Sequence, residues 1–396
     1  MLSASGLMGQ KREGWPCLRG RRFGVLANQS AVDGSGQVLW ASLLADGMRP
    51  QLLLGPEHGL WGVEQDMVPV EGGADPLTGL PVHSLYGHDT HSLDPDPALL
   101  EGLDLVLFDI QDIGSRYYTF QATLQRLLRV CARARVAVVV LDRPNPLGRP
   151  TEGRTLDLGF QSFVGQAPLP NRHGLTMGEL ARLFVQLENL DCDLTVVPCV
   201  GWQGGAQPEE PLPWPWVPPS PNMPDFETAL VYPGACLLEA TNLSEGRGTT
   251  TPFRLLGAPW LDHPERLARG LEGARGSAGL AVTPAWFRPG FQKHAGQLCG
   301  GLRLAARQPS AVRSYAFFLG LLAQLRARYQ AFAWRQETYE FVASVPAIDL
   351  LVGDSQYRQL VDSGRHLDDY LAARSGEDQD FLHLTEPLLL YPRANP

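Results

Sequence analysis

Short apolar runs alternate with amphipathic segments over the first 200 residues of the chain. The runs have the length and the leucine- and valine-rich composition of buried strands, which predicts strands at Phe23–Ala27, Gln51–Leu54, Asp104–Phe108, Val136–Leu141 and Leu194–Val197. Between them, apolar residues recur every three or four positions, which predicts helices at Gly36–Ala45, at Tyr118–Ala134 and from Thr176 onward. This alternation indicates an α/β fold with a Rossmann-like parallel sheet covered by helices on both faces.

The pattern changes in the second half of the chain. Residues 201–224 are rich in proline and tryptophan, which predicts an ordered extended segment that forms a flap or a cleft wall. A helix is expected at Asp225–Ala240, and later segments predict strands at Ala281–Phe287 and Leu302–Ala306 and helices at Ser310–Tyr329, Ser355–Leu360 and His366–Arg374. We therefore expect a Rossmann-like catalytic domain over residues 1–258 and a smaller C-terminal α/β domain over residues 259–396.

The composition is that of a globular protein with a large core: 396 residues, of which 44% are hydrophobic and 19% charged. A net charge of −9 argues against a nucleic-acid partner, because binding to phosphates requires an excess of lysine and arginine. No apolar run is long enough to span a bilayer, and the first residues lack the apolar segment of a secretory signal. We expect a cytoplasmic protein, or an exported one if a leader has been removed. The sequence makes no prediction of oligomeric state.

Polar side chains gather where the predicted parallel strands end. Groups that form hydrogen bonds or transfer protons follow four strands in turn: Asn28; Glu57 and His58; Asp109, Gln111, Arg116 and Tyr117; Arg143 and Asn145. Ligands of open parallel sheets bind beyond the carboxyl ends of the strands. Because the sheet itself does not need so many polar groups for stability, we expect a ligand-binding cleft at this edge.

The sequence Gly-Pro-Glu-His-Gly at positions 55–59 stands directly behind an apolar strand. Proline and glycine fix the backbone of the turn, so the side chains of Glu57 and His58 are held in defined directions. Carboxylate and imidazole are common proton-transfer groups, and we interpret both residues as catalytic candidates. The alternative is a solvated glutamate in a surface turn.

A second catalytic group is less clearly marked. Glu245 shares a glycine-flanked turn with Arg247, a setting that suits an exposed functional loop, and we take Glu245 as the second carboxyl candidate. Glu152, Asp112 and an acetamido group of the substrate are the alternatives.

Several polar residues near these loops have two interpretations. Arg143 and Arg116 either pair with Asp142 and Asp112 or bind a substrate carboxylate, whose geometry the guanidinium group matches. Asp109 either satisfies buried backbone amides or binds a ligand.

The remaining arginine and the tyrosines are also ambiguous. Arg172 precedes a capping box at Thr176 and is placed to contact an anion at that helix start. Tyr117 and Tyr118 either stack on a ring of the substrate or cap the helix that follows.

The signatures of several enzyme classes are absent from the sequence. It contains no GxGxxG after a strand, no GxxxxGK[ST], no GxSxG and no HExxH, which disfavours nicotinamide dehydrogenases, P-loop enzymes, serine esterases and zincins. The six cysteines form no CxxC pair, and the histidines at His88 and His91 have no third ligand in register. We expect no metal and no cofactor, and acid–base chemistry on a polar, anionic organic substrate.

A series of motifs in one order extends over nearly the whole chain. They are Asn28-Gln29-Ser30, GPEHG at 55–59, DPLTGLPVHSLYG at 75–87, FDIQD at 108–112, LDRPNP at 141–146, RHG at 172–174, PSPNMP at 219–224, EGRGTT at 245–250 and Lys293-His294. With these motifs the chain resembles the exo-β-N-acetylmuramidase family, the NamZ-like glycoside hydrolases once known as a domain of unknown function. Members of this family often carry an export signal, and this sequence shows none.

The resemblance implies a Rossmann-like domain, a smaller C-terminal domain and a cleft near their junction. It implies release of N-acetylmuramic acid from the non-reducing end of peptidoglycan fragments, with Glu57 as the leading catalytic residue. A noncatalytic sensor that binds muropeptides or sugars is the alternative function.

The implied sugar carries a lactyl carboxylate and an acetamido group, and both need partners in the protein. The lactyl carboxylate would pair with Arg116, Arg143, Arg172 or Arg247, of which Arg143 is favoured and Arg247 is second. The acetamido group would suit Asn145 or Asn222.

Overall fold

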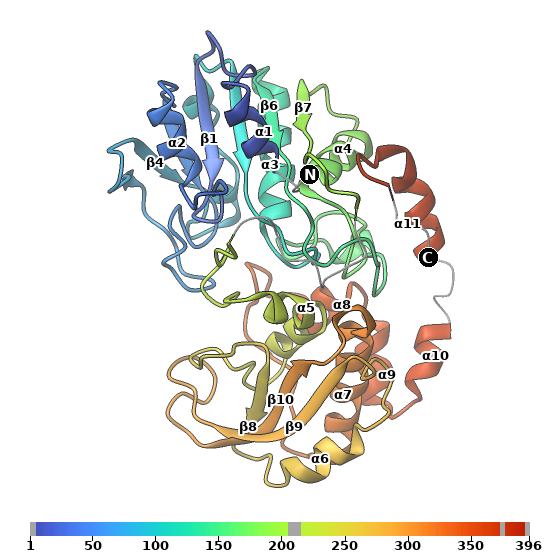
Figure 1. The fold of residues 1–396 in the computed structure, drawn as a ribbon. Coiled ribbons are helices and arrows are strands. Elements are labelled where there is room, and N and C mark those ends of the chain that lie inside the picture. The colour runs from blue at the N-terminus through green and yellow to red at the C-terminus, as the bar shows by residue number, and fades with distance from the viewer. Residues whose placement is uncertain (1–4, 205–214, 373–376, 393–396) are drawn as a thin grey trace.

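Two α/β bodies stacked end to end make up the molecule (Figure 1). The structure is a computed structural model that describes residues 5–204, 215–372 and 377–392. The first body contains a seven-stranded sheet and the second a three-stranded sheet. Within these residues, no helix has the length and apolar character needed to cross a membrane.

The large sheet confirms the predicted Rossmann-like class. Its strands are β1 (Phe23–Ala27), β2 (Leu52–Gly55), β3 (Gly73–Ala74), β4 (Pro81–Ser84), β5 (Leu105–Asp109), β6 (Ala137–Leu141) and β7 (Leu194–Val197). They lie in the order β3-β4-β2-β1-β5-β6-β7, and all pairs are parallel except β3 with β4. Without β3 this is the strand order of doubly wound sheets, in which the order of successive strands across the sheet reverses between β1 and β5.

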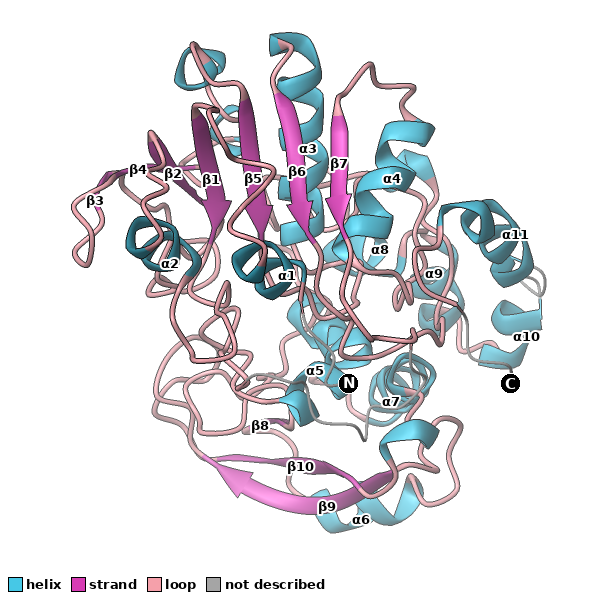
Figure 2. Cartoon of the chain, turned by 45° about the horizontal axis from the view of Figure 1, so that its top comes forward, coloured by secondary structure: helices cyan, strands magenta, loops and turns pink. Residues whose placement is uncertain are grey.

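Helices cover both faces of this sheet (Figure 2). On one face lie α1 (Gly6–Arg12) and α2 (Leu39–Ala45), and on the other α3 (Phe120–Ala134) and α4 (Met177–Leu187). The predicted capping box is present, because the Thr176 side chain accepts from the Glu179 amide while the Glu179 side chain accepts from the Thr176 amide. Strands β1, β2, β5 and β6 are buried along their whole length, which explains their continuous apolar runs.

The second body is built on an antiparallel sheet. Its strands β8 (Leu255–Ala258), β9 (Leu280–Phe287) and β10 (Cys299–Ala306) lie in the order β8-β10-β9. The helices of this part are α5 (Phe226–Ala235), α6 (Pro264–Gly270), α7 (Ser314–Arg328), α8 (Ala347–Val352), α9 (Gln356–Asp362) and α10 (Leu367–Ala372). A Cβ on Gly234 would lie 2.1 Å from the Ser314 carbonyl oxygen, so α5 and α7 approach this closely only because Gly234 has no side chain.

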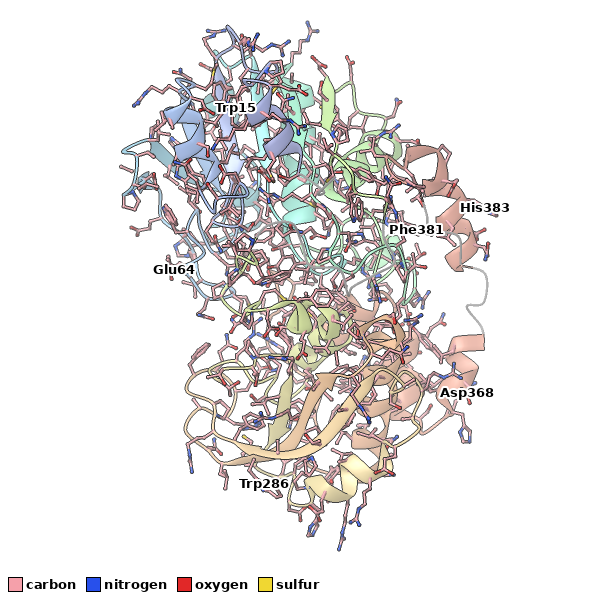
Figure 3. The ribbon with its side chains drawn as sticks, viewed as in Figure 1. Trp15, Glu64, Trp286, Asp368, Phe381 and His383 are labelled. Atoms are coloured by element: carbon pink, nitrogen blue, oxygen red, sulfur yellow. The ribbon has the colours of Figure 1, made fainter. Side chains whose placement is uncertain are left out.

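The two bodies share one hydrophobic core. It runs from β5, β6, α3 and α4 of the large sheet into α5 and α7 of the second body. The parallel strands β1, β5, β6 and β7 all point toward the second body (Figure 2). The loops at their carboxyl ends therefore lie at the junction, which side chains of both bodies fill (Figure 3).

The division expected at residue 259 differs from this arrangement of elements. Both α5 and β8 precede residue 259, yet α5 packs on α7 and β8 pairs with β10 in the second body. After α11 (Glu377–Thr385), the end of the chain returns to the first body, where the Tyr391 hydroxyl donates a hydrogen bond of 2.7 Å to Asp142 Oδ2. The four-residue β8 is apolar throughout, so its pattern did not reveal which sheet it joins.

The five strands predicted in the first body agree with the structure to within one residue. The helix expected at Asp225–Ala240 ends as an α-helix at Ala235 and continues as a 3₁₀ helix, Cys236–Ala240, and Pro233 in its last turn lacks an amide to donate. Strand β4 was missed because it begins with a proline and carries polar residues, so no apolar run marks it. Arg374, the end of the last predicted helix, lies outside the described residues.

Candidate active site

Two adjoining chambers lie between the bodies, and Asp66 and Glu239 line both of them. The outer chamber has a volume of about 640 Å³, within the ~300–1,000 Å³ typical of sites for small ligands. The inner chamber has a volume of about 40 Å³, which admits a water-sized group but no ring-sized ligand. Loops after β2 and β5 contribute to the inner chamber, so the cleft expected at the carboxyl edge of the sheet is confirmed.

Glu57 reaches the inner chamber from the turn that follows β2. It is 4% exposed, and Thr119 Oγ1, just before α3, donates a hydrogen bond of 2.6 Å to Glu57 Oε2. Gly59 completes the turn with a φ of 82°, a conformation that other residues rarely adopt. The local sequence thus turns a buried carboxylate toward the space between the bodies.

His58 lies beside Glu57 and lines the same chamber. Its φ of 68° is in the left-handed region, which is unfavourable for a residue with a side chain. Its Nδ1 lies 2.9 Å from the carbonyl oxygen of Glu64. Because a carbonyl only accepts, this contact places a proton on Nδ1.

A second buried carboxyl group, Glu340, enters the inner chamber from the second body. The hydroxyl of Tyr86, which follows β4, lies 3.4 Å from Glu340 Oε2. Burial, and after it the charge of Glu57, raise the pKa of Glu340 well above its ordinary value. Burial and the charges of the same two carboxyl groups raise the pKa of Tyr86. This environment favours the protonated form of Glu340, and Tyr86 stays a neutral phenol.

Arg247 holds three carboxylates together where the chambers meet. Its guanidinium nitrogens lie 3.1 Å from Asp66 Oδ1, 2.6 Å from Glu239 Oε1 and 3.3 Å from Glu245 Oε1. It also lies over the Phe253 ring, 5.0 Å from the centroid. Burial lowers the pKa of Arg247, but these carboxylates together outweigh burial and raise it well above its ordinary value. This network fixes three acidic side chains around the entrance to the inner chamber.

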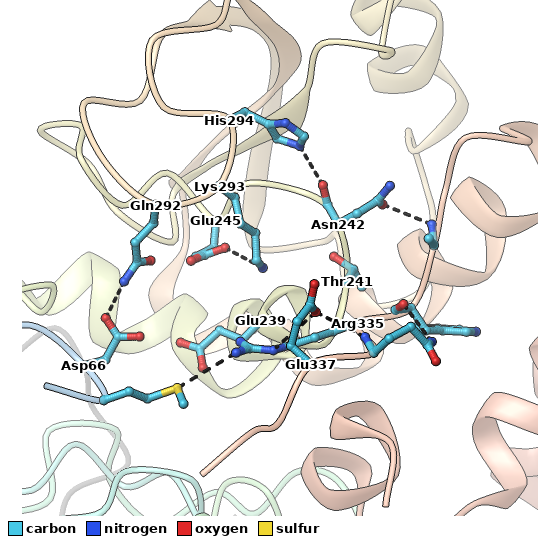
Figure 4. A pocket seen from close by; sticks show the side chains of 14 residues that line it. Asp66, Glu239, Thr241, Asn242, Glu245, Gln292, Lys293, His294, Arg335 and Glu337 are labelled. Atoms are coloured by element: carbon cyan, nitrogen blue, oxygen red, sulfur yellow. Dashed lines mark hydrogen bonds and ion pairs between the residues drawn. The ribbon is translucent and has the colours of Figure 1, made fainter. Parts of the chain in front are cut away.

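Most residues that line the outer chamber are polar, and most of them belong to the second body (Figure 4). Gln292 donates a hydrogen bond of 2.6 Å to Asp66 Oδ1, and Lys293 donates one of 3.0 Å to Glu245 Oε2. Arg335 points into the same chamber from the loop between α7 and α8. Acceptors and donors thus surround a space that is open to a polar ligand.

The structure brings six of the predicted site residues together. Five of them line the inner chamber and Glu245 lines the outer one; the five are Glu57, His58, Tyr117, Asn222 and Arg247. Asn222 belongs to the segment expected to form a cleft wall, and its Nδ2 donates to Gln65 Oε1 at 2.8 Å. Trp214 of that segment lies outside the described residues. Trp202 packs against Tyr391 and Trp216 donates to the Met223 carbonyl, so neither is left in solvent.

The remaining predicted arginines lie inside the protein, away from the described linings of both chambers. Arg143 forms a bidentate ion pair with Asp109, with 3.0 Å between its Nη2 and Asp109 Oδ2, and this pair replaces the Arg143–Asp142 pair considered from the sequence. Arg116 donates to three backbone carbonyls, at 2.6 Å to that of Leu351. Arg172 donates to the Leu147 carbonyl, and burial lowers its pKa to about 10.

The other polar candidates also bond to the protein itself. Asn28 Nδ2 donates to the Pro219 carbonyl at 2.9 Å, and Asn145 Nδ2 donates to that of Leu175 at 3.0 Å. Gln111 Nε2 donates to two carbonyls of neighbouring loops, those of Asp112 and Pro144. Glu152 accepts from the Ala316 amide and Asp112 from the Gly114 amide, so these alternatives for a second carboxyl group have structural partners. These residues build the loops that position the chambers.

Sequence reasoning missed several residues of the site, among them Asp66, Tyr86, Thr119, Glu239, Arg335 and Glu340. Tyr86 follows β4, so recognising that strand would have placed it at the carboxyl edge. Glu340 and the next residue, Phe341, have φ values of 44° and 67°, and no local sequence motif predicts this turn. Among the residues that the structure describes, no group of three His, Cys, Asp or Glu is arranged to hold a metal ion.

Two family models match this sequence and together span most of it. The model described as Exo-beta-N-acetylmuramidase NamZ, N-terminal, matches residues 23–227, and that described as Exo-beta-N-acetylmuramidase NamZ, C-terminal, matches residues 230–391. The Peptidoglycan beta-N-acetylmuramidase NamZ of Bacillus subtilis (strain 168) is 35% identical over 382 residues, which are 94% of this chain and 88% of that protein. The junction between the two models falls within α5.

Two crystal structures of DUF1343 family proteins from Bacteroides fragilis NCTC 9343 resemble this fold. One has a TM-score of 0.86 at 27% identity and covers 98% of this chain and 99% of its own. The other has a TM-score of 0.78 at 28% identity and covers both chains completely. The likeness of fold therefore extends over both bodies.

Proposed function

Because the chain belongs to the exo-β-N-acetylmuramidase NamZ family, we propose that it is a glycoside hydrolase acting on peptidoglycan fragments. In this proposal it releases terminal β-1,4-linked N-acetylmuramic acid from the non-reducing end. The muropeptide or disaccharide occupies the outer chamber, whose volume of about 640 Å³ suits a substituted sugar.

The pairing of Glu57 with Glu340 in the inner chamber is the observation that carries the proposal. Most glycosidases use two carboxyl groups, one of which donates a proton to the leaving oxygen while the other acts as a carboxylate. When the environments of two carboxyl groups push their pKa values apart, the protonated one is the natural acid. The pKa of Glu340 is raised by burial and by Glu57, so Glu340 holds the proton.

Each residue of the chamber then has a role in the reaction. Glu340 gives its proton to the glycosidic oxygen, and Tyr86, 3.4 Å from its carboxyl group, orients that group. As the glycosidic bond breaks, water takes the place of the leaving oxygen on the anomeric carbon, and Glu57, held by the hydroxyl of Thr119, accepts the proton that this water gives up. The small inner chamber beside these groups excludes bulk solvent and admits a water-sized reactant, the second substrate of a hydrolysis.

A chromogenic substrate tests the proposal directly. The purified protein should release 4-nitrophenol from 4-nitrophenyl β-N-acetylmuramide and free N-acetylmuramic acid from disaccharides that carry it at the non-reducing end. If the pure protein binds these compounds without any release above background, it is a noncatalytic sensor and the proposed enzyme function is wrong.

A further inference from the structure

Most cations of the two chambers are already neutralised by the protein. Arg247 holds three carboxylates, as described above. Lys293 Nζ donates to the Leu238 and Leu243 carbonyls at 2.9 and 3.1 Å and to Glu245 Oε2 at 3.0 Å, which uses all three of its protons. The positive charge of each group is thus already balanced by carboxylates of the protein.

Arg335 differs from both. Its guanidinium group lines the outer chamber, yet Nη2 donates only to the Thr338 carbonyl, at 3.1 Å, and to the Met67 sulfur, at 4.0 Å. Nε is buried and has no hydrogen-bond partner. The nearest carboxylate in an ion pair with it, Glu337, is 4.0 Å away and its side chain is 79% exposed, so the attraction is weak. Arg335 therefore brings to the chamber a positive charge that, in the described part of the chain, only the more distant Glu337 offsets (Figure 4).

The position of Arg335 connects the outer chamber with the reacting groups. Its guanidinium lies over the ring of Tyr339, 5.2 Å from the centroid, and Tyr339 itself lines the inner chamber. The Tyr339 hydroxyl donates a hydrogen bond of 2.6 Å to Glu239 Oε2, which fixes the ring. Glu340 is the next residue along the chain. Tyr339 thus connects the binding place of a ligand on Arg335 with the inner chamber, which Glu340 also lines.

We propose that Arg335 binds the lactyl carboxylate of N-acetylmuramic acid and so sets the preference for this sugar over N-acetylglucosamine. The inference rests on the proposed function. The two sugars differ in the lactyl group alone, and that group is a carboxylate, which a guanidinium binds through charge-assisted hydrogen bonds. Arg143 and Arg247, which the sequence favoured for this role, hold carboxylates of the protein instead.

The test compares kcat/KM on the 4-nitrophenyl β-glycosides of the two sugars for the wild type and for Arg335→Gln. The wild type should prefer the muramide strongly. In Arg335→Gln, kcat/KM on the muramide should fall roughly 30-fold or more, the scale of a lost hydrogen bond to a charged group, while the value on the glucosaminide stays within about 3-fold. Arg335→Lys should restore part of the preference.

Two control variants separate this role from general effects of charge and folding. Arg307→Gln removes an exposed arginine of the second body that lines neither chamber and should leave both substrates unchanged. Lys293→Met breaks bonds to two carbonyls and to Glu245, so it should lower the melting temperature without altering the ratio of the two kcat/KM values.

Binding of the free sugars gives a second, independent measurement. By calorimetry, wild-type protein should bind N-acetylmuramic acid more tightly than its lactyl amide, and Arg335→Gln should bind both equally. An unchanged preference for the acid in a folded Arg335→Gln protein overturns the inference and leaves the proposed function standing. If the wild type hydrolyses neither glycoside, the proposed function fails, and the binding comparison still decides the role of Arg335.

Discussion

The Tyr86 hydroxyl lies 3.4 Å from Glu340 Oε2, although the two residues are 254 positions apart in the chain. Tyr86 follows a strand of the large sheet, whereas Glu340 stands in a loop of the second body. The pKa of Glu340 is raised by burial and by the charge of Glu57, which also belongs to the first body. The proposed acid is therefore created by the docking of the two bodies, since neither body supplies both carboxyl groups.

Glu57→Gln should abolish most of the hydrolytic activity. The amide keeps the size of the side chain but loses the negative charge and the ability to take a proton, so kcat should fall roughly 10²- to 10⁴-fold. The measurement is the rate of 4-nitrophenol release from the muramide at saturating substrate. Glu64→Gln is the matched control, because Glu64 lies at the junction of the bodies (Figure 3) and its hydrogen bonds with His58 use only its backbone. A kcat for Glu57→Gln equal to that of the control would rule out a catalytic Glu57.

Thr119→Val should reduce catalysis while leaving the fold intact. The change removes the 2.6 Å hydrogen bond to Glu57 and keeps the shape of the side chain, so kcat should fall roughly 10- to 100-fold. Thr119 makes no side-chain cap bond to α3, so the melting temperature should fall only by the cost of one lost hydrogen bond to a buried carboxylate. Thr119→Ser retains the hydroxyl and should retain most of the activity. Equal losses in the serine and valine variants would show that the hydroxyl is not the cause.

Glu340→Gln should make the protein more stable, and more so at high pH. The raised pKa means that the folded state binds the Glu340 proton more tightly than the unfolded state. The resulting stabilisation is complete below the unfolded pKa of about 4.3 and is lost as the pH rises through the raised folded value. The difference in melting temperature between Glu340→Gln and the wild type should therefore grow from pH 4 to pH 8. A difference that is constant over this range would contradict the buried, protonated carboxyl group.

The same raised pKa predicts the pH dependence of the reaction. If Glu340 donates the proton, kcat of the wild type should fall as the pH rises through its pKa. In Glu340→Gln this descending limb should disappear, together with most of the activity on substrates with a poor leaving group. A descending limb that persists unchanged in the variant would assign the acid to another residue.

Arg143→Met should damage stability rather than substrate preference. Arg143 and Asp109 form a fully buried ion pair, and removal of one partner leaves a buried charge at a cost of about 3–5 kcal/mol. Chemical denaturation measures this loss. The double change Arg143→Met with Asp109→Leu should recover much of it, because no unpaired charge remains. If Arg143→Met folds and loses its preference for the muramide, Arg143 binds the substrate and this prediction is wrong.

Local sequence was sufficient for five strands of the large sheet and for the turn that carries Glu57. The buried strands of a parallel sheet appear as continuous apolar runs. Gly55, Pro56 and Gly59 define the turn around Glu57. The capping box at Thr176 likewise depends on residues only three positions apart. Such features could be predicted because each one is decided by neighbours in the chain.

The partner of Glu57 could not be predicted in this way. Glu340, Tyr86 and Arg335 carry no motif that distinguishes them from other polar residues, and their role arises from burial and from contacts across the junction. Arg143 shows the opposite case. Its rigid loop suggested a ligand-binding role, but in the structure Asp109 neutralises the charge of Arg143 inside the protein. Sequence by itself determined the parallel sheet, the family and the placement of Glu57. Only the tertiary structure decided which charges are paired and which face the chambers, because pairing depends on distances between side chains that are remote in the chain.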